Sequence, residues 1–322
     1  MGEEAKSMSK KLISFCIPCY RSEQTLEGVI TEIEETMKKM ASYSYEIILV
    51  NDGSPDNTWG KIRELADKSE QKNILGINLA KNFGQHAAIM AALNAAAGDY
   101  VVCLDDDGQT PADEVDKLIA ALEGGADVAY ARYSHKQHNL FRNFGTAMNE
   151  WMASVMLGKP KDLYVSSYFA VKRFVVNEMV KYESSYPYVI GLVLRTTRNI
   201  VNVDVTHRRR EVGQSGYTLS KLFALWINGF TAFSIKPLRI ATVTGAVFAI
   251  LGFIYGIYTI IKKFVLPDVQ IGFSALMSAV VFMGGAIMLM LGMIGEYLGR
   301  LYISQNKNPQ FVIRETTRDE NE

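Results

Sequence analysis

The chain has 322 residues, of which 48% are hydrophobic and 21% charged, a composition typical of globular or membrane-associated proteins rather than disordered ones. The formal net charge is zero, so no overall basic signature points to nucleic acid, and we expect no nucleic-acid partner. Cys16, Cys19 and Cys103 all lie in apolar runs, which favours packed thiols over a disulfide framework or a redox pair. The N-terminal MGEEAKSMSKK shows no long apolar core after its charges, so no signal peptide is predicted.

From Leu12 onward, short apolar runs alternate with segments of helical periodicity. Strands are expected at 12–17, 45–50, 73–79, 101–104 and 126–131, and helices around 30–40 and 85–97. Such alternation indicates βαβ units and an α/β fold with a mostly parallel sheet, in which ligands bind beyond the carboxyl ends of the strands. Polar residues follow every expected strand and should line one edge: 18–21, 51–54, 81–84, 105–107 and Arg132.

The stretch VVCLDDDGQTPADE, residues 101–114, carries the clearest chemical signal. Because side chains alternate along a strand, Asp105 and Asp107 should face one side and Asp106 the other. The first pair can then share a cation, with the side-chain oxygen of Gln109 as a third ligand, and such oxygen ligands suit Mg²⁺ or Mn²⁺. Taken alone, the run favours a simpler alternative, in which the acids solvate a loop and begin a helix.

The composition changes near residue 235. The uncharged stretches 240–261 and 269–295 contain 22 and 27 residues, and each exceeds the roughly 20 that a bilayer requires. We predict two transmembrane helices within 240–299 rather than a buried helical hairpin. The preceding segment, 216–239, is amphipathic and is predicted to form interfacial helices. The balance of flanking Lys and Arg places the large N-terminal domain, 1–215, and a tail, 300–322, in the cytoplasm.

Several motifs together carry a family resemblance: FCIPCY, VNDGSPDNT, NFGQHAAIMAAL, LDDDGQTP followed by Glu114, HRRREVGQSGYTLSKL, AFSIKPLR and GEYLGRLYI. In this order and spacing, the chain resembles the family-2 glycosyltransferases that act on polyprenyl phosphates, the group of dolichol-phosphate mannose synthase and bactoprenol glucosyltransferase. The resemblance covers nearly the whole chain. It implies a GT-A fold, a nucleotide-sugar donor, a divalent metal (Mg²⁺ or Mn²⁺), inversion at the anomeric carbon, a membrane anchor, membrane-lipid partners and a homo-oligomer, specifically a tetramer.

The resemblance also assigns roles to individual residues. Nucleotide binding falls to residues at the strand ends: Pro18, Tyr20, Glu23, Asp52, Ser54, Lys81, Asp105 and Asp106. Asp105, Asp107 and Gln109 match the D-x-D-x-Q metal motif, although Asp106 and Gly108 replace its usual Ala and Leu. Glycine and small polar residues at strand ends are also ordinary turn chemistry, which is the alternative for the segment Asn51-Asp52-Gly53-Ser54.

Basic side chains complete the assignment. Asp107, Arg132, Arg210 and Asp162 are the expected catalytic residues, with Asp162 as the base if one is used. Arg132, Arg142, Ser215 and Arg210 are expected to bind the acceptor phosphate, since guanidinium groups match phosphate oxygens. Arg210 belongs to the R-x-x-G-x-S-x-Y pattern, whereas Arg208 and Arg209 are expected at the membrane surface.

The resemblance therefore predicts a metal-dependent, inverting hexosyltransferase. It should move one sugar from a nucleotide sugar, UDP-glucose or a UDP-N-acetylhexosamine, to undecaprenyl or another polyprenyl phosphate. The product would be a lipid-linked sugar for cell-envelope glycan modification, made on the cytoplasmic face by a multi-pass protein of the inner or plasma membrane. A phosphate acceptor is already ionised and requires no strong base. Two alternatives remain: a processive polysaccharide synthase and a non-enzymatic nucleotide-binding subunit. The absence of a Q-x-x-R-W sequence from the chain argues against the first.

Overall fold

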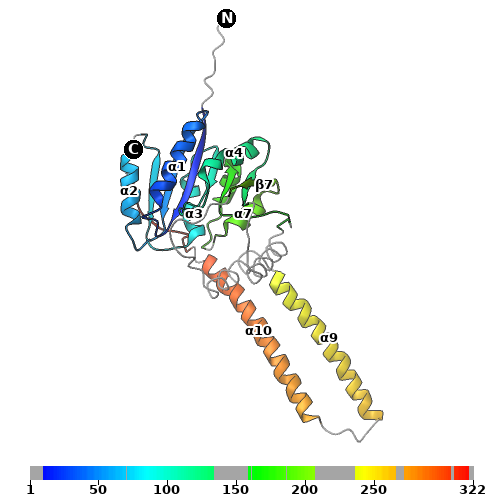
Figure 1. The fold of residues 1–322 in the computed structure, drawn as a ribbon. Coiled ribbons are helices and arrows are strands. Elements are labelled where there is room, and N and C mark those ends of the chain that lie inside the picture. The colour runs from blue at the N-terminus through cyan, green and yellow to red at the C-terminus, as the bar shows by residue number, and fades with distance from the viewer. Residues whose placement is uncertain are drawn as a thin grey trace. The chain divides into compact units, whose positions relative to one another are not determined.

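A computed structural model describes residues 10–69, 71–133, 159–160, 162–185, 187–206, 236–265, 272–305 and 308–318 (Figure 1). The chain divides into two compact units. The first contains residues 1–217 together with 307–322, and the second contains residues 218–306. The end of the chain thus returns to the first unit, where the sequence predicted only a cytoplasmic tail.

The first unit is built on an eight-stranded sheet in the order β7-β5-β6-β4-β1-β2-β3-β8. The strands are β1 (Lys11–Cys19), β2 (Tyr43–Asn51), β3 (Ile74–Leu79), β4 (Tyr100–Cys103), β5 (Val128–Tyr133), β6 (Phe169–Lys172), β7 (Ile200–Val205) and β8 (Ile313–Thr316). Neighbouring strands are parallel, except where β6 and β8 pair antiparallel with theirs. The predicted mostly parallel α/β sheet is confirmed, and β6 lies between β4 and β5, which the sequence did not predict.

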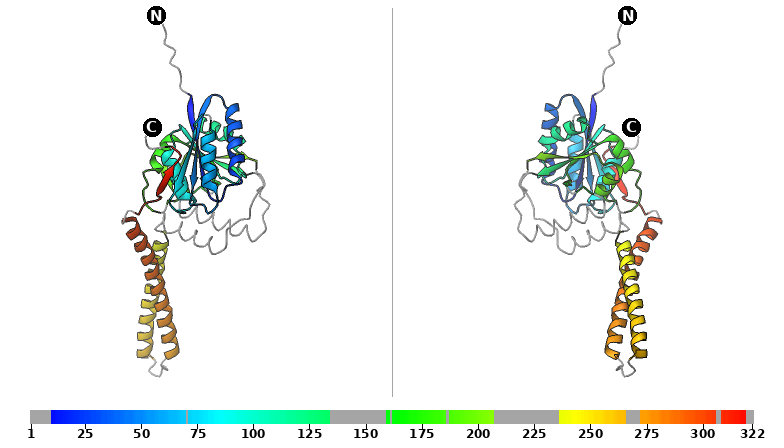
Figure 2. Two further views of the ribbon diagram at one scale, coloured as in Figure 1. Left: turned by 90° about the vertical axis from the view of Figure 1, so that its left-hand side faces the viewer. Right: turned by 90° about the vertical axis from the view of Figure 1, so that its right-hand side faces the viewer.

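Helices cover both faces of this sheet (Figure 2). They are α1 (Leu26–Lys39), α2 (Thr58–Lys68), α3 (Gln85–Ala95), the short 3-10 turn η1 (Ala112–Glu114), α4 (Val115–Glu123), α6 (Arg173–Met179) and α7 (Val189–Thr196). In α1, the buried residues Ile30, Ile33 and Met37 recur at helical spacing and pack against alternate residues of β1. The small side chains of α3 allow it to pack closely on the opposite face of β1 and β2. Covered on both faces, β1 is buried over seven consecutive residues.

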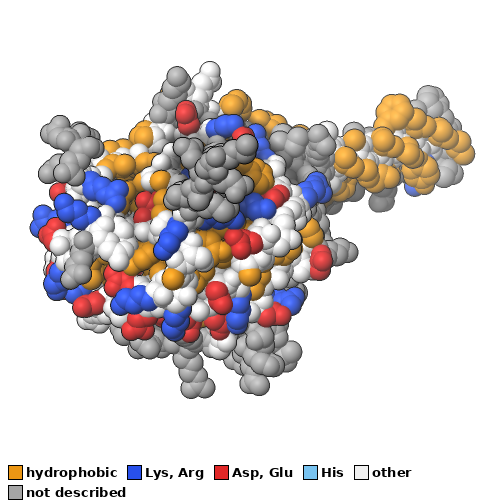
Figure 3. Space-filling view, turned by 90° about the horizontal axis from the view of Figure 1, so that it is seen from above, with side chains coloured by type: hydrophobic (Ala, Val, Ile, Leu, Met, Phe, Trp, Pro, Cys, Tyr) orange, Lys and Arg blue, Asp and Glu red, His pale blue; other side chains and the backbone are white. Residues whose placement is uncertain are grey.

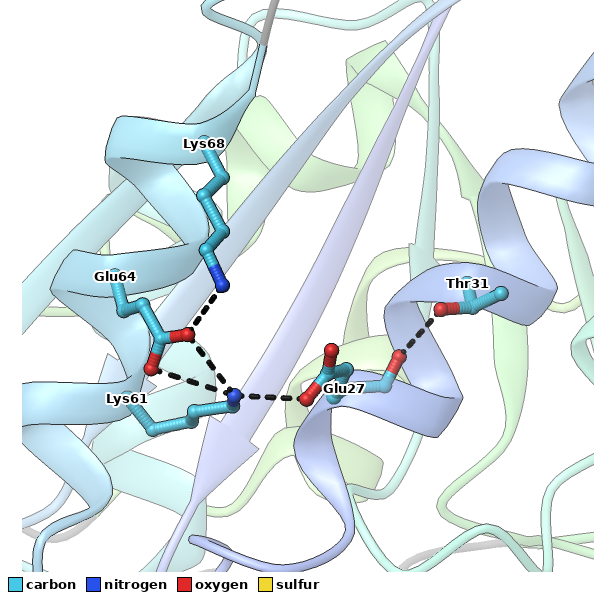
Figure 4. Close-up of polar contacts among 5 residues, drawn as sticks. All are labelled: Glu27, Thr31, Lys61, Glu64 and Lys68. Carbon is cyan, nitrogen blue, oxygen red and sulfur yellow. Dashed lines mark hydrogen bonds and ion pairs between the residues drawn. The ribbon is translucent and has the colours of Figure 1, made fainter.

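An ion-pair network joins α1 to α2 on the outside of the unit (Figure 4). The Lys61 ammonium lies 2.7 Å from Glu27 Oε2 on α1 and 3.4 Å from Glu64 on its own helix. Lys68 approaches the same Glu64 at 2.5 Å. Most of these charges are well exposed, so we expect the network to contribute little to the stability of the fold.

The second unit contains two long helices, α9 (Lys236–Val265) and α10 (Phe273–Gln305). They contact each other through Phe248 and Phe282, whose ring centroids are 5.5 Å apart. Large hydrophobic side chains are exposed along both helices, and Figure 3 shows such side chains gathered on their described part. Of the helices that the structure describes, α10 alone is long and apolar enough to cross a membrane by length and composition, over Phe282–Gly299.

The second predicted span lies on α10, and the first lies on α9, whose apolar stretch Thr242–Tyr255 is shorter. A pair of spans therefore stays a prediction. Most of the predicted interfacial segment, 216–235, lies outside the described residues, and its last residues, 236–239, begin α9.

Candidate active site

Loops at the carboxyl ends of β1, β2, β3 and β4 hydrogen-bond to one another, as expected of the polar strand ends. The Asp106 carboxylate connects the loops after β4 and β1. Its Oδ2 accepts a hydrogen bond from the Tyr20 backbone N–H at 3.0 Å and another from the Ser22 hydroxyl. Burial raises the pKa of Asp106, although these two donors oppose the shift. Asp106 therefore fixes the position of the loop after β1.

Asp105 faces a different set of groups. Its Oδ1 accepts a hydrogen bond from Gln85 Nε2 on α3 at 2.9 Å, and its Oδ2 accepts one from the Ser167 hydroxyl. Burial raises the pKa of the Tyr133 phenol, and the negative charges of Asp105 and Asp107 raise it further, so both acids lie near that hydroxyl. β4 ends at Cys103, before the three aspartates, so the predicted alternation of Asp105 and Asp107 against Asp106 stays a prediction.

The turn after the aspartates is set by Asp107 and Gly108. Asp107 Oδ1 accepts a hydrogen bond from the Gln109 backbone N–H at 3.1 Å, across a turn in which Gly108 has φ of 71°. That left-handed conformation suits glycine, which has no Cβ to clash. The turn thus ties the Gln109 backbone to Asp107, and the metal-binding role of the Gln109 side chain stays a prediction.

Asp52 connects the loop after β2 to the loop after β3. It is buried, and its two carboxylate oxygens accept hydrogen bonds from the backbone N–H groups of Phe83, at 2.7 Å, and Gly84, at 2.9 Å. Burial raises the pKa of Asp52, and these two N–H groups oppose the shift. Gly53 has φ of 61°, and a Cβ there would lie 2.5 Å from the Asn82 backbone nitrogen. The two loops thus meet at a contact that only glycine permits.

The loops after β1 and β2 are also joined. Ser54 Oγ accepts a hydrogen bond from the Arg21 backbone N–H at 3.1 Å, and Glu23 Oε2 accepts one from the Asn57 backbone N–H at 3.3 Å. Arg21 has φ of 60°, a conformation that non-glycine residues rarely adopt and that clusters at functional sites. The Tyr20 ring is 46% exposed and lies beneath the Arg21 guanidinium at 5.5 Å. An exposed aromatic ring beside these carboxylates is suited to stacking on a nucleotide base.

Two further predicted nucleotide residues lie in or beside these loops. Pro18 belongs to β1 and pairs with Val50 of β2. Lys81 is exposed, with its ammonium 5.1 Å above the Phe83 ring. Pro18 therefore has a role in the sheet, whereas Lys81 places a cation at the edge of the loop that Asp52 holds.

The predicted phosphate-binding arginine Arg132 lies inside β5 rather than after it, a correction to the expected end of that strand. Its guanidinium makes a two-point ion pair with Asp204 of β7, with Nε–Oδ1 of 2.7 Å and Nη2–Oδ2 of 3.0 Å. Asp204 raises the pKa of the Arg132 guanidinium, and Arg132 lowers the pKa of the Asp204 carboxyl group, so both groups stay charged. Both side chains are about half exposed, so the pair is accessible to a competing anion.

Other predicted residues lie elsewhere. Asp162 is exposed in a turn closed by the hydrogen bond from the Leu163 N–H to the Pro160 carbonyl. Arg142, Arg210 and Ser215 lie outside the described residues, as do Arg208 and Arg209. Of the four residues predicted to bind an acceptor phosphate, Arg132 is the one that lies among the described residues.

The aspartates fit a hard divalent cation. No group of three or more His, Cys, Asp or Glu side chains converges as a metal cage within the part of the chain that the structure describes. Magnesium and manganese sites in nucleotide enzymes take one or two carboxylates from the protein and fill the remaining positions with water and phosphate oxygens. Asp105 and Asp107, with the amide oxygen of Gln109, supply a donor set of that kind.

Several residues of this site were not predicted from the sequence. Ser167 and Ser22 anchor the aspartates, and Asp204 holds Arg132, yet none belongs to a motif that marks it. Gln85 lies in NFGQHAAIMAAL, which was noted for family resemblance and not for a contact with Asp105.

Comparison with known proteins supports the resemblance. The family model described as "Glycosyl transferase family 2" matches residues 14–180, and the model described as "GtrB C-terminal hairpin" matches residues 236–301. Undecaprenyl-phosphate 4-deoxy-4-formamido-L-arabinose transferase of Proteus mirabilis is 32% identical over 306 residues, covering 94% of this chain and 93% of that protein. The protein of the same name from Yersinia enterocolitica is 32% identical over 312 residues, covering 96% of this chain and 95% of that protein.

A solved structure shares the fold. Glucosyl-3-phosphoglycerate synthase from Mycobacterium tuberculosis, in complex with Mn²⁺, uridine diphosphate and phosphoglyceric acid, has a TM-score of 0.50 at 18% identity. The match covers 67% of this chain and 74% of that one. At this identity the likeness concerns the fold alone.

Proposed function

We propose that this chain, which belongs to glycosyl transferase family 2 and has its GT-A fold, transfers one sugar from a nucleotide sugar to a polyprenyl phosphate at a membrane. The observation that carries the proposal is the joining of the loops at the strand ends: Asp106 holds the loop after β1, Asp105 accepts from Gln85 at the start of α3, and Asp52 joins the loops after β2 and β3. The hairpin match and the lipid phosphate named for the relatives support the acceptor class.

The donor nucleotide belongs at the interlocked loops. Tyr20 offers an exposed ring for the base, and Ser54 and Lys81 lie on loops fixed by Asn51 and Asp52. Glu23 and Asp106 contribute by accepting hydrogen bonds from backbone N–H groups of those loops. Donor binding therefore depends on a frame that is in place before the nucleotide arrives.

Asp105 and Asp107, with Gln109, would hold Mg²⁺ or Mn²⁺ at this edge. When bound, the cation supplies positive charge that stabilises the departing diphosphate. The solved structure that shares the fold contains Mn²⁺, which supports a divalent cation in this proposal. Gln85 and Ser167 keep the Asp105 carboxylate oriented for that role.

The acceptor is held by basic residues. Arg132, with Arg142, Arg210 and Ser215, would bind the lipid phosphate, whose oxygen attacks the anomeric carbon with inversion. Because Arg132 is paired with Asp204, an arriving phosphate must displace that carboxylate or use the remaining guanidinium hydrogens. A phosphate monoester is largely ionised at neutral pH, so transfer needs no strong base, and Asp162 serves only if one is used.

The membrane part of the proposal uses both long helices. We propose that α9 and α10 both span the inner or plasma membrane, which places the first unit on the cytoplasmic face. The chain would act as a homo-oligomer, a tetramer by resemblance. Donors compatible with the proposal are UDP-glucose, a UDP-N-acetylhexosamine and, from the name of the relatives, a nucleotide-linked 4-deoxy-4-formamido-L-arabinose.

The proposal is tested by incubating the full chain in detergent with undecaprenyl phosphate, Mg²⁺ or Mn²⁺ and each candidate donor, with GDP-mannose added to the panel. A lipid-linked monosaccharide detected by mass spectrometry from at least one donor is the expected result. The Asp107→Ala variant, purified identically, is the matched control and should form product at least on the order of a hundredfold more slowly. Nucleotide binding without product from any donor would favour the non-enzymatic subunit, and a polymeric product would favour a processive synthase.

A further inference from the structure

The C-terminal segment 308–318 is part of the sheet, although it follows the last long helix. Its strand β8 pairs antiparallel with β3 at the edge of the sheet, and Figure 2 shows this red strand alongside the first unit. Gln310 is buried, and its Nε2 donates hydrogen bonds to the carbonyls of Tyr182 and Ser184. The segment is therefore fixed at several points rather than lying loosely on the surface.

A chain of side-chain hydrogen bonds leads from this strand to the nucleotide loop. Glu315 Oε1 accepts a hydrogen bond from Asn78 Nδ2 at 2.8 Å. Asn78 Oδ1 accepts one from Asn51 Nδ2, also at 2.8 Å. Asn51 Oδ1 in turn accepts one from the Ser54 backbone N–H at 3.2 Å. This series of hydrogen bonds crosses β8, β3 and β2 and ends on Ser54, a residue expected to bind the nucleotide.

The two asparagines in this series of hydrogen bonds are buried: Asn51 is 3% exposed and Asn78 is 6% exposed. Each amide accepts with its oxygen on the side of Ser54 and donates with its nitrogen on the side of Glu315. Buried polar groups that lose a partner carry a free-energy cost, so this orientation is favoured while the terminal acceptor is present. Glu315, at the exposed end, is that acceptor.

The same strand supports the neighbouring loop. The Ala80 N–H donates to the Val312 carbonyl at 2.8 Å, and Arg314 Nη2 donates to the Ala80 carbonyl at 2.8 Å. Ala80 directly precedes Lys81 and the turn held by Asp52. The C-terminal segment thus contacts the frame of the donor loops at two places.

We infer that Glu315 is a positioning residue for donor binding, which fixes the loop 52–54 through Asn78 and Asn51. The inference rests on the proposed function for the identity of the ligand, since that loop is the expected nucleotide site. It adds to the donor site a residue from the C-terminal end of the chain, beyond the conventional catalytic motifs. Glu315 does not touch the nucleotide itself, so its effect should fall on donor binding and not on the chemical step.

The test compares full-length Glu315→Ala, Glu315→Gln and Ile313→Ala in detergent. Ile313 is on the same strand with an exposed side chain, so its truncation controls for general loosening of β8. Two measurements are made: backbone hydrogen exchange of peptides covering 51–57, and the affinity for UDP and GDP by calorimetry. Peptides from β1 and α1 report any global change in stability.

Glu315→Ala should speed exchange in 51–57, leave β1 and α1 unchanged, and weaken binding of the preferred nucleotide about threefold to tenfold, the effect of losing one hydrogen bond. The donor KM should rise by a similar factor with kcat nearly unchanged. Glu315→Gln should restore most of both properties, because its amide oxygen can still accept from Asn78. Ile313→Ala should behave as the wild type.

Unchanged exchange in Glu315→Ala, or equal loosening in Ile313→Ala, would overturn the positioning role whatever the nucleotide data show. Failure of the proposed function has a different signature. In that case the wild type binds neither UDP nor GDP, while Glu315→Ala still loosens 51–57 and Glu315→Gln still restores it. The positioning role of Glu315 would then be supported, and the assignment of the loop 52–54 as a nucleotide site would be wrong.

Discussion

The donor half of the site and the acceptor half are built differently. In the donor half, partly or fully buried carboxylates such as Asp52 and Asp106 hold backbone N–H groups of neighbouring loops. In the acceptor half, Arg132 is held by an exposed ion pair with Asp204. Buried, hydrogen-bonded groups are costly to disturb, whereas exposed ion pairs contribute little to stability. The difference teaches that the loops assigned to the donor are held by buried contacts, whereas the half-exposed ion pair leaves Arg132 able, in the proposed function, to exchange Asp204 for a lipid phosphate.

The largest expected effect comes from the aspartates of the donor half. Asp107→Ala should lower kcat by on the order of a hundredfold to a thousandfold, since the departing diphosphate loses its stabilising charge. EDTA should have the same effect on the wild type. Initial rates of lipid-linked sugar formation measure both. Retained turnover in EDTA would remove the metal from the account.

The next effect tests the acceptor half. Arg132→Ala should lower kcat/KM for polyprenyl phosphate on the order of a hundredfold, because a guanidinium that binds phosphate is lost. Asp204→Asn should instead lower the KM for the lipid phosphate severalfold, because its competitor for Arg132 is weakened. Nucleotide affinity should not change in either variant. An equal loss of activity in both variants would mean that the pair is only structural.

A pH effect on stability should come from His86, in the first turn of α3. Its Nδ1 is buried and has no hydrogen-bond partner among the described residues, its ring meets Tyr188 edge-on at 5.2 Å, and burial lowers its pKa from 6.5 to about 4. In this window the unfolded chain binds the proton and the folded chain does not, so stability is fully present above pH 6.5 and is lost as the pH falls toward 4. The loss should reach roughly 3 kcal/mol.

His86→Phe keeps an apolar ring against Tyr188 and removes the titrating group. Its melting temperature should therefore depend less on pH between 6.5 and 4 than that of the wild type, measured on the same detergent-solubilised protein. An unchanged slope would show that His86 is not the group responsible.

A smaller effect is expected at Asp106. Burial raises its pKa, so ionisation is disfavoured in the folded protein, and the stability cost is absent below pH 3.8 and fully present above the raised pKa. Asp106→Asn keeps an oxygen that can accept from Tyr20 N–H, so it should raise stability at pH 7 by on the order of 1 kcal/mol. Its effect on turnover should be milder than that of Asp107→Ala. A clear loss of stability would show that the charge itself holds the loop after β1.

The smallest effect should come from outside the site. Lys61→Met removes the cation shared by Glu27 and Glu64 and should shift the melting temperature by less than about 2 °C, with turnover unchanged. Thermal unfolding and the transfer assay check it together. A large loss of activity would mean that the packing of α1 on α2 controls the donor loops.

The sequence predicted the first five strands along the chain better than the last three. β1 to β4 are long or fully apolar runs, and their polar ends meet as expected. β6 has only four residues, and β8 reads IRET, with mostly exposed side chains and no apolar alternation, so neither carried a strand signal. β8 is a strand because β3 offers an unpaired edge, which is information from tertiary structure.

The same limit applies to the site. Side-chain alternation predicted that Asp105 and Asp106 would face different groups, and the two carboxylates do accept hydrogen bonds from different partners. Ser167 and Asp204 could not be found, because each meets its partner across more than sixty residues of sequence and neither type is distinctive for such a contact. Motif spacing identifies the groups that do chemistry, and the packing of distant strands identifies the groups that hold them.

The measurement that tests the central claim most directly is a comparison of acceptors. The full chain, with its preferred donor and Mg²⁺ or Mn²⁺, is given either undecaprenyl phosphate or undecaprenol, and the lipid products are identified by mass spectrometry. A site without a strong general base should glycosylate the ionised phosphate and leave the alcohol unreacted. Product from undecaprenyl phosphate alone is the predicted result, and comparable transfer to undecaprenol would contradict it.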